Sequence, residues 1–422
     1  EGQGMGFDAG EYGDRVEGIA KVFDDRVFTG ERTSTENSEV PVFIVGMPRS
    51  GTTLVEHRFD GHVVHRRTVT VQNGVHVSAD NALELMNCCV ACTVRNDLLD
   101  YLRQLHRRPG VDRIVVRLPP WTEPEHLCYA LTRSACARDV AVSAVVTAVH
   151  TPTWLPAAVD EEELDDGRTV AQVLVGQVEF ADVVVLSEVH PDTLAVIRRL
   201  APKARITVGL QRLERALGHL RPDARRGRSD NPHGSLLAGQ PPLEPMGPVR
   251  LLEFAARRPF HPERLYTAVD LLLEGVVRSR GRLWLANRTD RVMWLESAGG
   301  GLRVDHAGLW LAAMTSREVA YVDPERRAMA DLAWSDRHGD RHTSMTVLVC
   351  GADPEEILAG LRAALLTDDH VARPWTLPYA VWSSGAAIIV LAREELHHPV
   401  VNLVGLLLVH EVARPLNDHL LQ

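Results

Sequence analysis

The sequence predicts an α/β fold, in which a mostly parallel sheet covered by helices is followed by a smaller α+β domain. Three observations support this prediction. Short β-branched runs alternate with segments of helical spacing up to about residue 220, as in parallel sheets with helical crossovers. Residues 221–248, rich in Arg, Pro, Gly, Ser and Asp, then interrupt the periodicity. Strand-like and helix-like segments resume over residues 249–370.

Composition narrows the class of protein. The chain has 422 residues, more than one ordinary domain, and its 45% hydrophobic and 24% charged residues exclude a disordered or fibrous protein. The net charge of −10 argues against direct sequence-specific nucleic-acid binding. The longest apolar run, Val400–Val409, is about half of a membrane span, so no membrane association is expected. Six cysteines do not form a disulfide framework in this length, and we find no signal peptide, so we expect a cytoplasmic location.

The first domain is expected over residues 41–220, after an acidic, Gly-rich leader at 1–40 that we expect to be poorly ordered. A buried strand at 42–45 opens this domain. The remaining expected elements are buried strands at 111–116, 140–149 and 181–186, with helices at 98–107 and 169–179 between them.

The second domain is expected over residues 249–370, after a linker at 221–248. Its expected elements are an amphipathic helix at 262–277, strands at 281–286, 292–296 and 346–350, and a turn at 299–301. A last helix at 355–366 has Asp353 as its N-cap and Pro354 in its first turn. Residues 371–422 form an unassigned tail.

A Gly-rich turn follows the first strand. Residues 46–53 match the phosphate-binding spacing G-x-x-x-x-G-K-[ST], except that Thr52 replaces the lysine, and the domain is therefore expected to be P-loop NTPase-like. Backbone N–H groups of such a turn converge on a phosphate, and Arg49 could supply the missing positive charge. Because residues 57–71 after the turn are strand-like, a plain strand and turn without nucleotide is the alternative. The candidate phosphate-binding residues are Gly46, Arg49, Ser50, Gly51, Thr52 and Thr53.

Residues 42–56 closely resemble the loop with which sulfotransferases bind the sulfate donor PAPS. The resemblance implies that the loop amides and the Ser and Thr hydroxyls hold the 5′-phosphosulfate group. It provides an alternative function, that of a PAPS-dependent sulfotransferase. We find no further sulfotransferase pattern downstream.

A longer resemblance covers residues 57–369. It is carried by segments 58–65, 89–98 and 180–182 in the first domain and by 258–265, 281–288, 294–300 and 339–343 in the second. These segments resemble the CobW family of metal-linked P-loop GTPases, and most closely its branch of ribosome hibernation factor-recruiting GTPases. The resemblance implies zinc-linked biology, GTP as a ligand, and a protein partner, namely a hibernation factor acting at the ribosome.

Two nucleotide motifs of that family are altered in this chain. The family's acidic motif, whose carboxylate binds Mg²⁺ or positions water, aligns with residues 117–120, which contain no carboxylate. The guanine-reading motif falls on residues 187–190, which lack its aspartate. Phosphoryl transfer depends on metal ligands and a positioned nucleophile. We therefore expect a degraded nucleotide site and, at most, a weak GTPase.

Three cysteines within five residues, Cys88, Cys89 and Cys92, are the candidate metal ligands. The C-x-x-C spacing of the last two lets both thiolates reach one tetrahedral Zn²⁺. Aligned with the family's Gly-Cys-x-Cys-Cys motif, the chain has Ala91 in place of one ligand. The alternative is a set of reduced thiols without metal. Further ligands could come from His57, His62 and His65.

The sequence thus predicts a CobW-like protein with a degraded nucleotide site. It would act in zinc-linked metal handling or in recruiting a hibernation factor to the ribosome. A PAPS-dependent sulfotransferase and a zinc metallochaperone that delivers metal to a client protein remain the alternatives.

Overall fold

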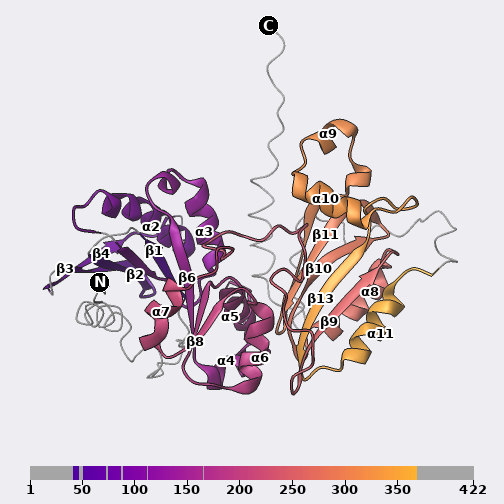
Figure 1. Ribbon diagram of the computed structural model, residues 1–422, viewed down its shortest axis with the longest axis horizontal. Helices are drawn as coiled ribbons and strands as arrows, with labels where there is room; N and C mark the ends of the chain where they lie inside the picture. Colours follow the sequence, from indigo (N-terminus) through magenta and orange to yellow (C-terminus); the bar gives the residue numbers. More distant parts are fainter. Residues whose placement is uncertain are drawn as a thin grey trace, which may run out of the picture.

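The computed structural model describes residues 41–46, 51–72, 75–86, 89–111, 113–164 and 166–367 (Figure 1). The expected leader at 1–40 and the tail at 371–422 lie outside the described residues. None of the described helices has the length and apolar character that crossing a bilayer requires.

The first domain is built on an eight-stranded sheet with strand order β4-β3-β2-β5-β1-β6-β7-β8. Strands β2 and β5, β6 and β7, and β7 and β8 pair in parallel. Strand β1 is antiparallel to both of its neighbours, and β3 to both of its own, so the other six strands all run in one direction. The expected mostly parallel sheet is confirmed. The strands are β1 (Pro41–Gly46), β2 (Thr52–Phe59), β3 (Val64–Gln72), β4 (Val75–Leu83), β5 (Arg113–Arg117), β6 (Val142–Val149), β7 (Val183–Leu186) and β8 (Arg205–Val208).

Helices cover both faces of this sheet because its strands are apolar on both sides. In β5, Ile114 and Val116 face a core with α2 and α3, whereas Val115 faces the opposite core, which contains Leu213 of α7. A third core lies under α4, α5 and α6. Full burial of each such aliphatic side chain contributes about 1.5–3 kcal/mol. The helices are α2 (Val90–His106), α3 (Pro124–Arg133), α4 (Thr151–Ala157), α5 (Val170–Glu179), α6 (Pro191–Leu200) and α7 (Leu213–Gly218).

The second domain has a five-stranded sheet of order β12-β11-β10-β13-β9, in which every pair is antiparallel. Helices α8 and α11 pack on one face over a core that includes Phe260 and Leu283. The elements are β9 (Val249–Ala256), α8 (Pro262–Ala268), β10 (Val276–Leu285), β11 (Arg288–Ala298), β12 (Gly301–Leu309), α9 (Ser316–Ala320), α10 (Pro324–Ala333), β13 (Thr343–Cys350) and α11 (Pro354–Ala364).

The helix expected at 262–277 is wrong beyond its first two turns. Helix α8 ends at Ala268, a 3₁₀ turn spans Val269–Leu272, and β10 begins at Val276. Gly275 has a φ of +68°, and a Cβ there would lie 2.7 Å from the backbone nitrogen of Ala352. Gly275 therefore adopts a left-handed conformation close to neighbouring backbone, and β10 begins directly after it. The apolar periodicity of this segment alone predicts a longer helix.

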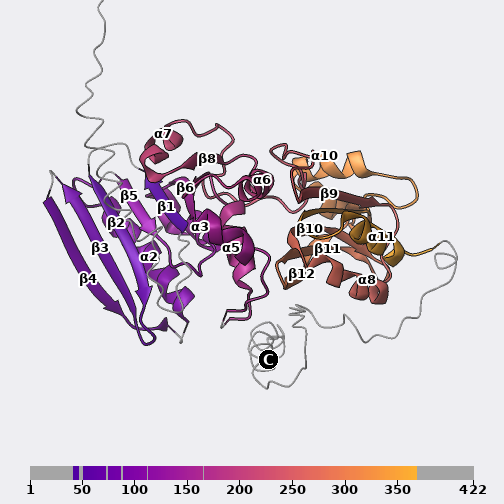
Figure 2. The ribbon, with the colours of Figure 1, turned by 90° about the horizontal axis from the view of Figure 1, so that it is seen from below.

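Helices α5 and α6 of the first domain pack against the sheet of the second (Figures 1 and 2). Val277, Ala298 and Leu348 of that sheet share their core. The expected linker at 221–248 is hydrogen-bonded to both domains. Within it, the carbonyls of Pro232 and Gly234 accept hydrogen bonds from the Arg282 guanidinium at 3.2 and 2.8 Å.

Candidate metal and nucleotide sites

The described ends of the predicted turn at 46–53 lie at the amino edge of the parallel strands. Gly46, at the end of β1, and Thr52, at the start of β2, both stand beside Arg113, the first residue of β5. Ligands of open α/β sheets bind beyond the carboxyl ends of the strands, at the opposite edge. Arg49 and Ser50 lie outside the described residues. The reversed direction of β1 therefore places both described ends of this segment, Gly46 and Thr52, away from the usual ligand crevice.

The described residues of the turn belong to the sheet. Thr53 is fully buried, and its Oγ1 lies 3.1 Å from the hydroxyl of Thr70 on β3. The carbonyl of Gly51 accepts a hydrogen bond from the Arg113 N–H at 2.9 Å. Among the described residues strand β2, rather than a helix, follows the turn, so the turn does not lead into a helix N-terminus of the phosphate-binding kind. Thr53 thus differs from the phosphate-binding role predicted for it, because its hydroxyl is held between strands.

The carboxyl edge is where the altered nucleotide motifs lie. The Ser187 Oγ accepts a hydrogen bond from the backbone N–H of Thr151 at 3.1 Å and lies 3.0 Å from the hydroxyl of Thr151. His190 caps α6, with its Nδ1 accepting the N–H of Thr193 at 3.4 Å. These side chains join β6 and β7 to the helices that follow, which is a structural role.

Residues 117–120 are also held by their neighbours. Arg117 Nη1 lies 2.9 Å from the Glu56 carboxylate on β2. The Gln177 side-chain amide of α5 donates to the carbonyl of Pro120 at 2.6 Å. The segment therefore connects β2, β5 and α5 at the edge where hydrolysis would require a free carboxylate.

The first turn of α2 carries the cysteine pair. Cys89 is the N-cap, and its Sγ accepts the backbone N–H of Cys92 at 3.2 Å. The Thr93 hydroxyl donates to the Cys89 carbonyl at 2.8 Å and accepts the Met86 N–H at 2.8 Å. Both cysteines are free thiols and half-exposed. The structure thus brings Cys89 and Cys92 together on one accessible turn, whereas Cys88 lies outside the described residues.

Cys89 influences the protonation of the Cys92 thiol. The side-chain contact with Cys89 raises the pKa of Cys92, and burial raises it further. At neutral pH without metal, the Cys92 sulfur is therefore protonated, and a bound cation would have to displace that proton.

Two of the nearby histidines contact carboxylates. His57 is buried, with Nε2 2.7 Å from Asp97 Oδ2 on α2, and His65 Nε2 lies 2.7 Å from Asp60 Oδ2. Across the part of the chain that the structure describes, no three His, Cys, Asp or Glu side chains are grouped so as to hold a metal. Neither His57 nor His65 is grouped with the cysteine pair as a metal-holding set among the described residues.

A row of side chains below the cysteines fixes α2 on the sheet. Asp97 also pairs with Arg66 of β3, whose guanidinium lies 3.8 Å from the centre of the Tyr101 ring. Cys89, Thr93, Asp97 and Tyr101 recur every fourth residue and so share one helix face. Sequence reasoning missed Thr93 and Asp97 as positioning residues, although this spacing is a signal that could have found them.

The remaining described cysteines are structural. Burial raises the pKa of Cys136 to about 11, and burial also raises the pKa values of Cys128 and Cys350. Inert thiols of this kind do not compete with an accessible pair for a metal.

Comparisons with known proteins define the family. Residues 54–201 match the family described as CobW/HypB/UreG, nucleotide-binding domain, and residues 249–365 match the cobalamin synthesis protein cobW C-terminal domain. The chain belongs to the CobW family, in which the first domain is the nucleotide-binding type and the second the characteristic C-terminal type. The match begins at residue 54, after the turn at 46–53.

Particular relatives can be named. The chain is 60% identical over 337 residues to a zinc chaperone of Mycobacterium tuberculosis, covering 77% of this chain and 85% of that protein. It is 24% identical over 331 residues to a zinc-regulated GTPase metalloprotein activator of Dictyostelium discoideum, covering 71% and 69% of the two chains. Among solved structures it is similar to the Zn(II)-bound YjiA GTPase from E. coli, with 13% identity, a TM-score of 0.32, and 75% and 91% of the two chains covered.

Proposed function

We propose that this protein handles zinc, binding Zn²⁺ through Cys89 and Cys92 on the first turn of α2 and passing it to a client protein. The observation that carries the proposal is the placement of the two half-exposed thiols, whose C-x-x-C spacing is held by the N-cap hydrogen bond of 3.2 Å. The names of two relatives, a zinc chaperone and a zinc-regulated GTPase metalloprotein activator, support it.

An incomplete ligand set suits a protein that gives its metal away. Structural zinc sites have four protein ligands and retain the ion, whereas open positions admit ligands of another molecule. Two sulfurs leave such positions open, and Cys88 is a third candidate ligand. The N-terminus of α2 also favours negative charge on both sulfurs once Zn²⁺ displaces their protons.

GTP has a secondary role in the proposed function. Ser187 and His190 are used structurally at the carboxyl edge, so we propose weak GTP binding and, at most, slow hydrolysis. Recruitment of a ribosome hibernation factor rests on the sequence resemblance, and PAPS binding rests on residues 46–53; neither is required for zinc transfer.

The test is a competition between the full chain and a chromophoric zinc chelator. We expect wild type to bind one Zn²⁺ and the Cys89→Ser/Cys92→Ser variant to lose about a hundredfold or more in affinity. Cys350→Ser, which removes a half-buried thiol of β13, is the matched control and should bind as wild type does. Zinc affinity that is unchanged in the double variant would overturn the proposal. Parallel titrations with GTP and PAPS separate the nucleotide alternatives.

A further inference from the structure

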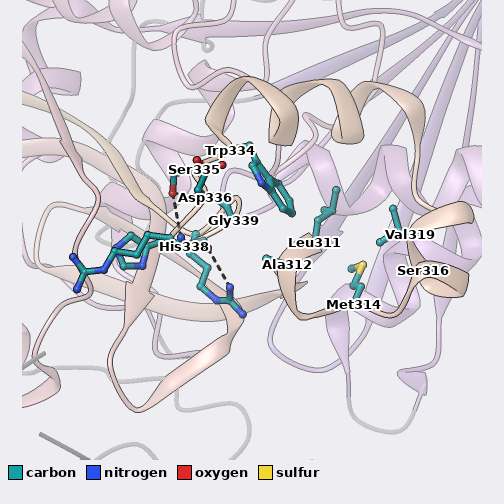
Figure 3. Close-up of a pocket in the computed structure, with 12 residues that line it drawn as sticks. Leu311, Ala312, Met314, Ser316, Val319, Trp334, Ser335, Asp336, His338 and Gly339 are labelled. Carbon is teal, nitrogen blue, oxygen red and sulfur yellow. Dashed lines mark hydrogen bonds between the residues drawn. The ribbon is translucent and has the colours of Figure 1, made fainter. Parts of the chain in front are cut away.

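A small lobe covers part of the second sheet. Between β12 and β13 the chain forms a 3₁₀ turn at Leu311–Ala313, then α9 and α10, and then a tight turn at residues 335–339. The lobe lies over Trp284, Val292 and Trp310, on the face opposite α8 and α11. A groove of about 590 Å³ opens between α9, the end of α10 and the tight turn (Figure 3).

The floor and one wall of this groove are apolar. Leu311, Met314 and Val319 line it, and the Trp334 ring stands beside them with 49% of the residue exposed (Figure 3). Exposed apolar side chains continue along the lobe, since Tyr321 is 84% and Leu332 81% exposed. Exposed apolar side chains beside an apolar groove are typical of an interaction site.

The other side of the groove is positively charged. Arg337 is exposed and makes no hydrogen bond or ion pair within the described residues. Arg341 donates only to carbonyl oxygens, those of Thr289 at 2.7 Å and His338 at 3.1 Å. Arg257, beside the lobe, likewise donates to a carbonyl, that of Ala333. These guanidinium groups therefore have no carboxylate partner in the described part of the chain.

Acidic residues near the groove are mostly committed to the backbone. The Asp340 carboxylate accepts the N–H groups of Leu311 and Ala312 at 2.8 and 2.9 Å, and the Glu318 carboxylate accepts the Thr315 N–H at 2.7 Å in the capping box of α9. Among the residues that line the groove, only Asp336 is acidic. Burial, followed by the charges of three nearby arginines, lowers the pKa of His338, which is the expected response to a positive surrounding.

The groove is preformed. Backbone hydrogen bonds join Ser335 and Gly339 in both directions, at 2.9 and 2.8 Å. Gly339 has a φ of +64°, and a Cβ there would lie 2.3 Å from that of Ala312. His338 packs edge-on against Trp284, with ring centres 5.0 Å apart. A rigid groove loses little conformational entropy when a partner binds.

We propose that this groove binds an acidic segment of a partner protein. An apolar side chain of the segment enters between Leu311 and Trp334, and its carboxylates pair with Arg337 and Arg341. A peptide fits better than a nucleotide, because apolar side chains line the groove and two further ones, Tyr321 and Leu332, are exposed on the same lobe. This inference goes beyond zinc binding and does not require it, since the lobe and the cysteine pair belong to different domains.

The test measures fluorescence anisotropy of a labelled synthetic peptide, with glutamates and a leucine at every third or fourth position, against the zinc-free full chain. We expect binding that Arg337→Glu weakens about tenfold or more. Trp334→Ala should also weaken it. Arg264→Glu, an exposed charge reversal on α8 across the sheet, is the matched control and should bind as wild type does. A glutamine-for-glutamate peptide and a serine-for-leucine peptide should both bind poorly.

Three results would overturn the proposal. The first is the absence of binding to wild type, and the second is an equal loss for Arg337→Glu and Arg264→Glu, which would indicate diffuse charge attraction. The third is displacement of the peptide by a nucleotide, which would assign the groove to that ligand. Arg337 is exposed and makes no hydrogen bond or ion pair within the described residues, so its variant is informative even where Trp334→Ala fails to fold.

Discussion

Replacing Glu179 with glutamine is expected to weaken the packing of the two domains against each other. Glu179 ends α5 and is 9% exposed, with Oε2 3.0 Å from Arg278 Nη2 and Oε1 bound to Arg280. Burial alone would raise the pKa of this carboxyl, but Arg278, Arg280 and Arg225 outweigh burial and lower it. The carboxylate is therefore ionised, and it compensates the two arginines that β10 brings to the interface.

The size of the expected destabilisation depends on the carboxylate partners that the two arginines keep in the variant. Removing one member of a buried ion pair costs about 3–5 kcal/mol. Arg278 keeps a second carboxylate, that of Glu296, at 3.3 Å, so the lower end applies. A loss of about 3 kcal/mol lowers the melting temperature by about 3–5 °C when the two domains unfold as one unit, because the entropy of unfolding is about 2.1 cal/mol/K per residue.

The assay is thermal unfolding followed by circular dichroism at neutral pH. Glu356→Gln, on the exposed side of α11, is the matched control and should melt as wild type does. Because the folded-state pKa of Glu179 is lowered, its contribution is present above the unfolded glutamate pKa of about 4.3 and is lost as the pH falls below it. The difference in melting temperature between wild type and Glu179→Gln should therefore disappear in acid. A neutral-pH melting temperature equal to that of Glu356→Gln would refute the reasoning.

Three further predictions concern the first domain. Gly51→Ala should destabilise the chain by about 1–3 kcal/mol in urea unfolding, because the new Cβ would lie 1.9 Å from the carbonyl oxygen of Gly110; an unchanged midpoint would contradict this. Thr93→Val should lower zinc affinity severalfold, because it removes the hydroxyl that holds the Cys89 carbonyl, while the chain stays folded by circular dichroism; full zinc affinity would show that the hydroxyl does not position the site. Zinc affinity should rise with pH, because the raised pKa of Cys92 makes Zn²⁺ compete with a proton, and a pH-independent constant in the chelator competition would count against thiolate ligation.

Much of the fold could be predicted because the relevant signals are local. Asp353 accepts the Glu355 N–H at 2.9 Å as the expected N-cap, and Thr169 closes a capping box at the start of α5. Each of these outcomes depends on a few neighbouring residues, which the sequence displays directly.

The direction of β1 could not be predicted. An apolar run such as Val42–Val45 specifies burial but not whether the strand is parallel or antiparallel to its neighbours. Its antiparallel insertion between β5 and β6 is a long-range choice, and it decides on which edge the turn at 46–53 lies.

The candidate metal site was predictable in its sulfurs but not in its surroundings. The C-x-x-C spacing points to Cys89 and Cys92, which share the first turn of α2. The pairing of His57 with Asp97 joins residues forty positions apart, and no spacing in the sequence indicates it. Imidazoles that look available in the sequence are thus already hydrogen-bonded in the fold.

The bonds between metal and sulfur can be measured directly by X-ray absorption spectroscopy of the full chain loaded with one equivalent of Zn²⁺. Thiolate ligation by Cys89 and Cys92 predicts at least two sulfur scatterers at about 2.3 Å, which disappear in the doubly substituted protein. A first shell made only of nitrogen and oxygen at about 2.0–2.1 Å in wild type would contradict it.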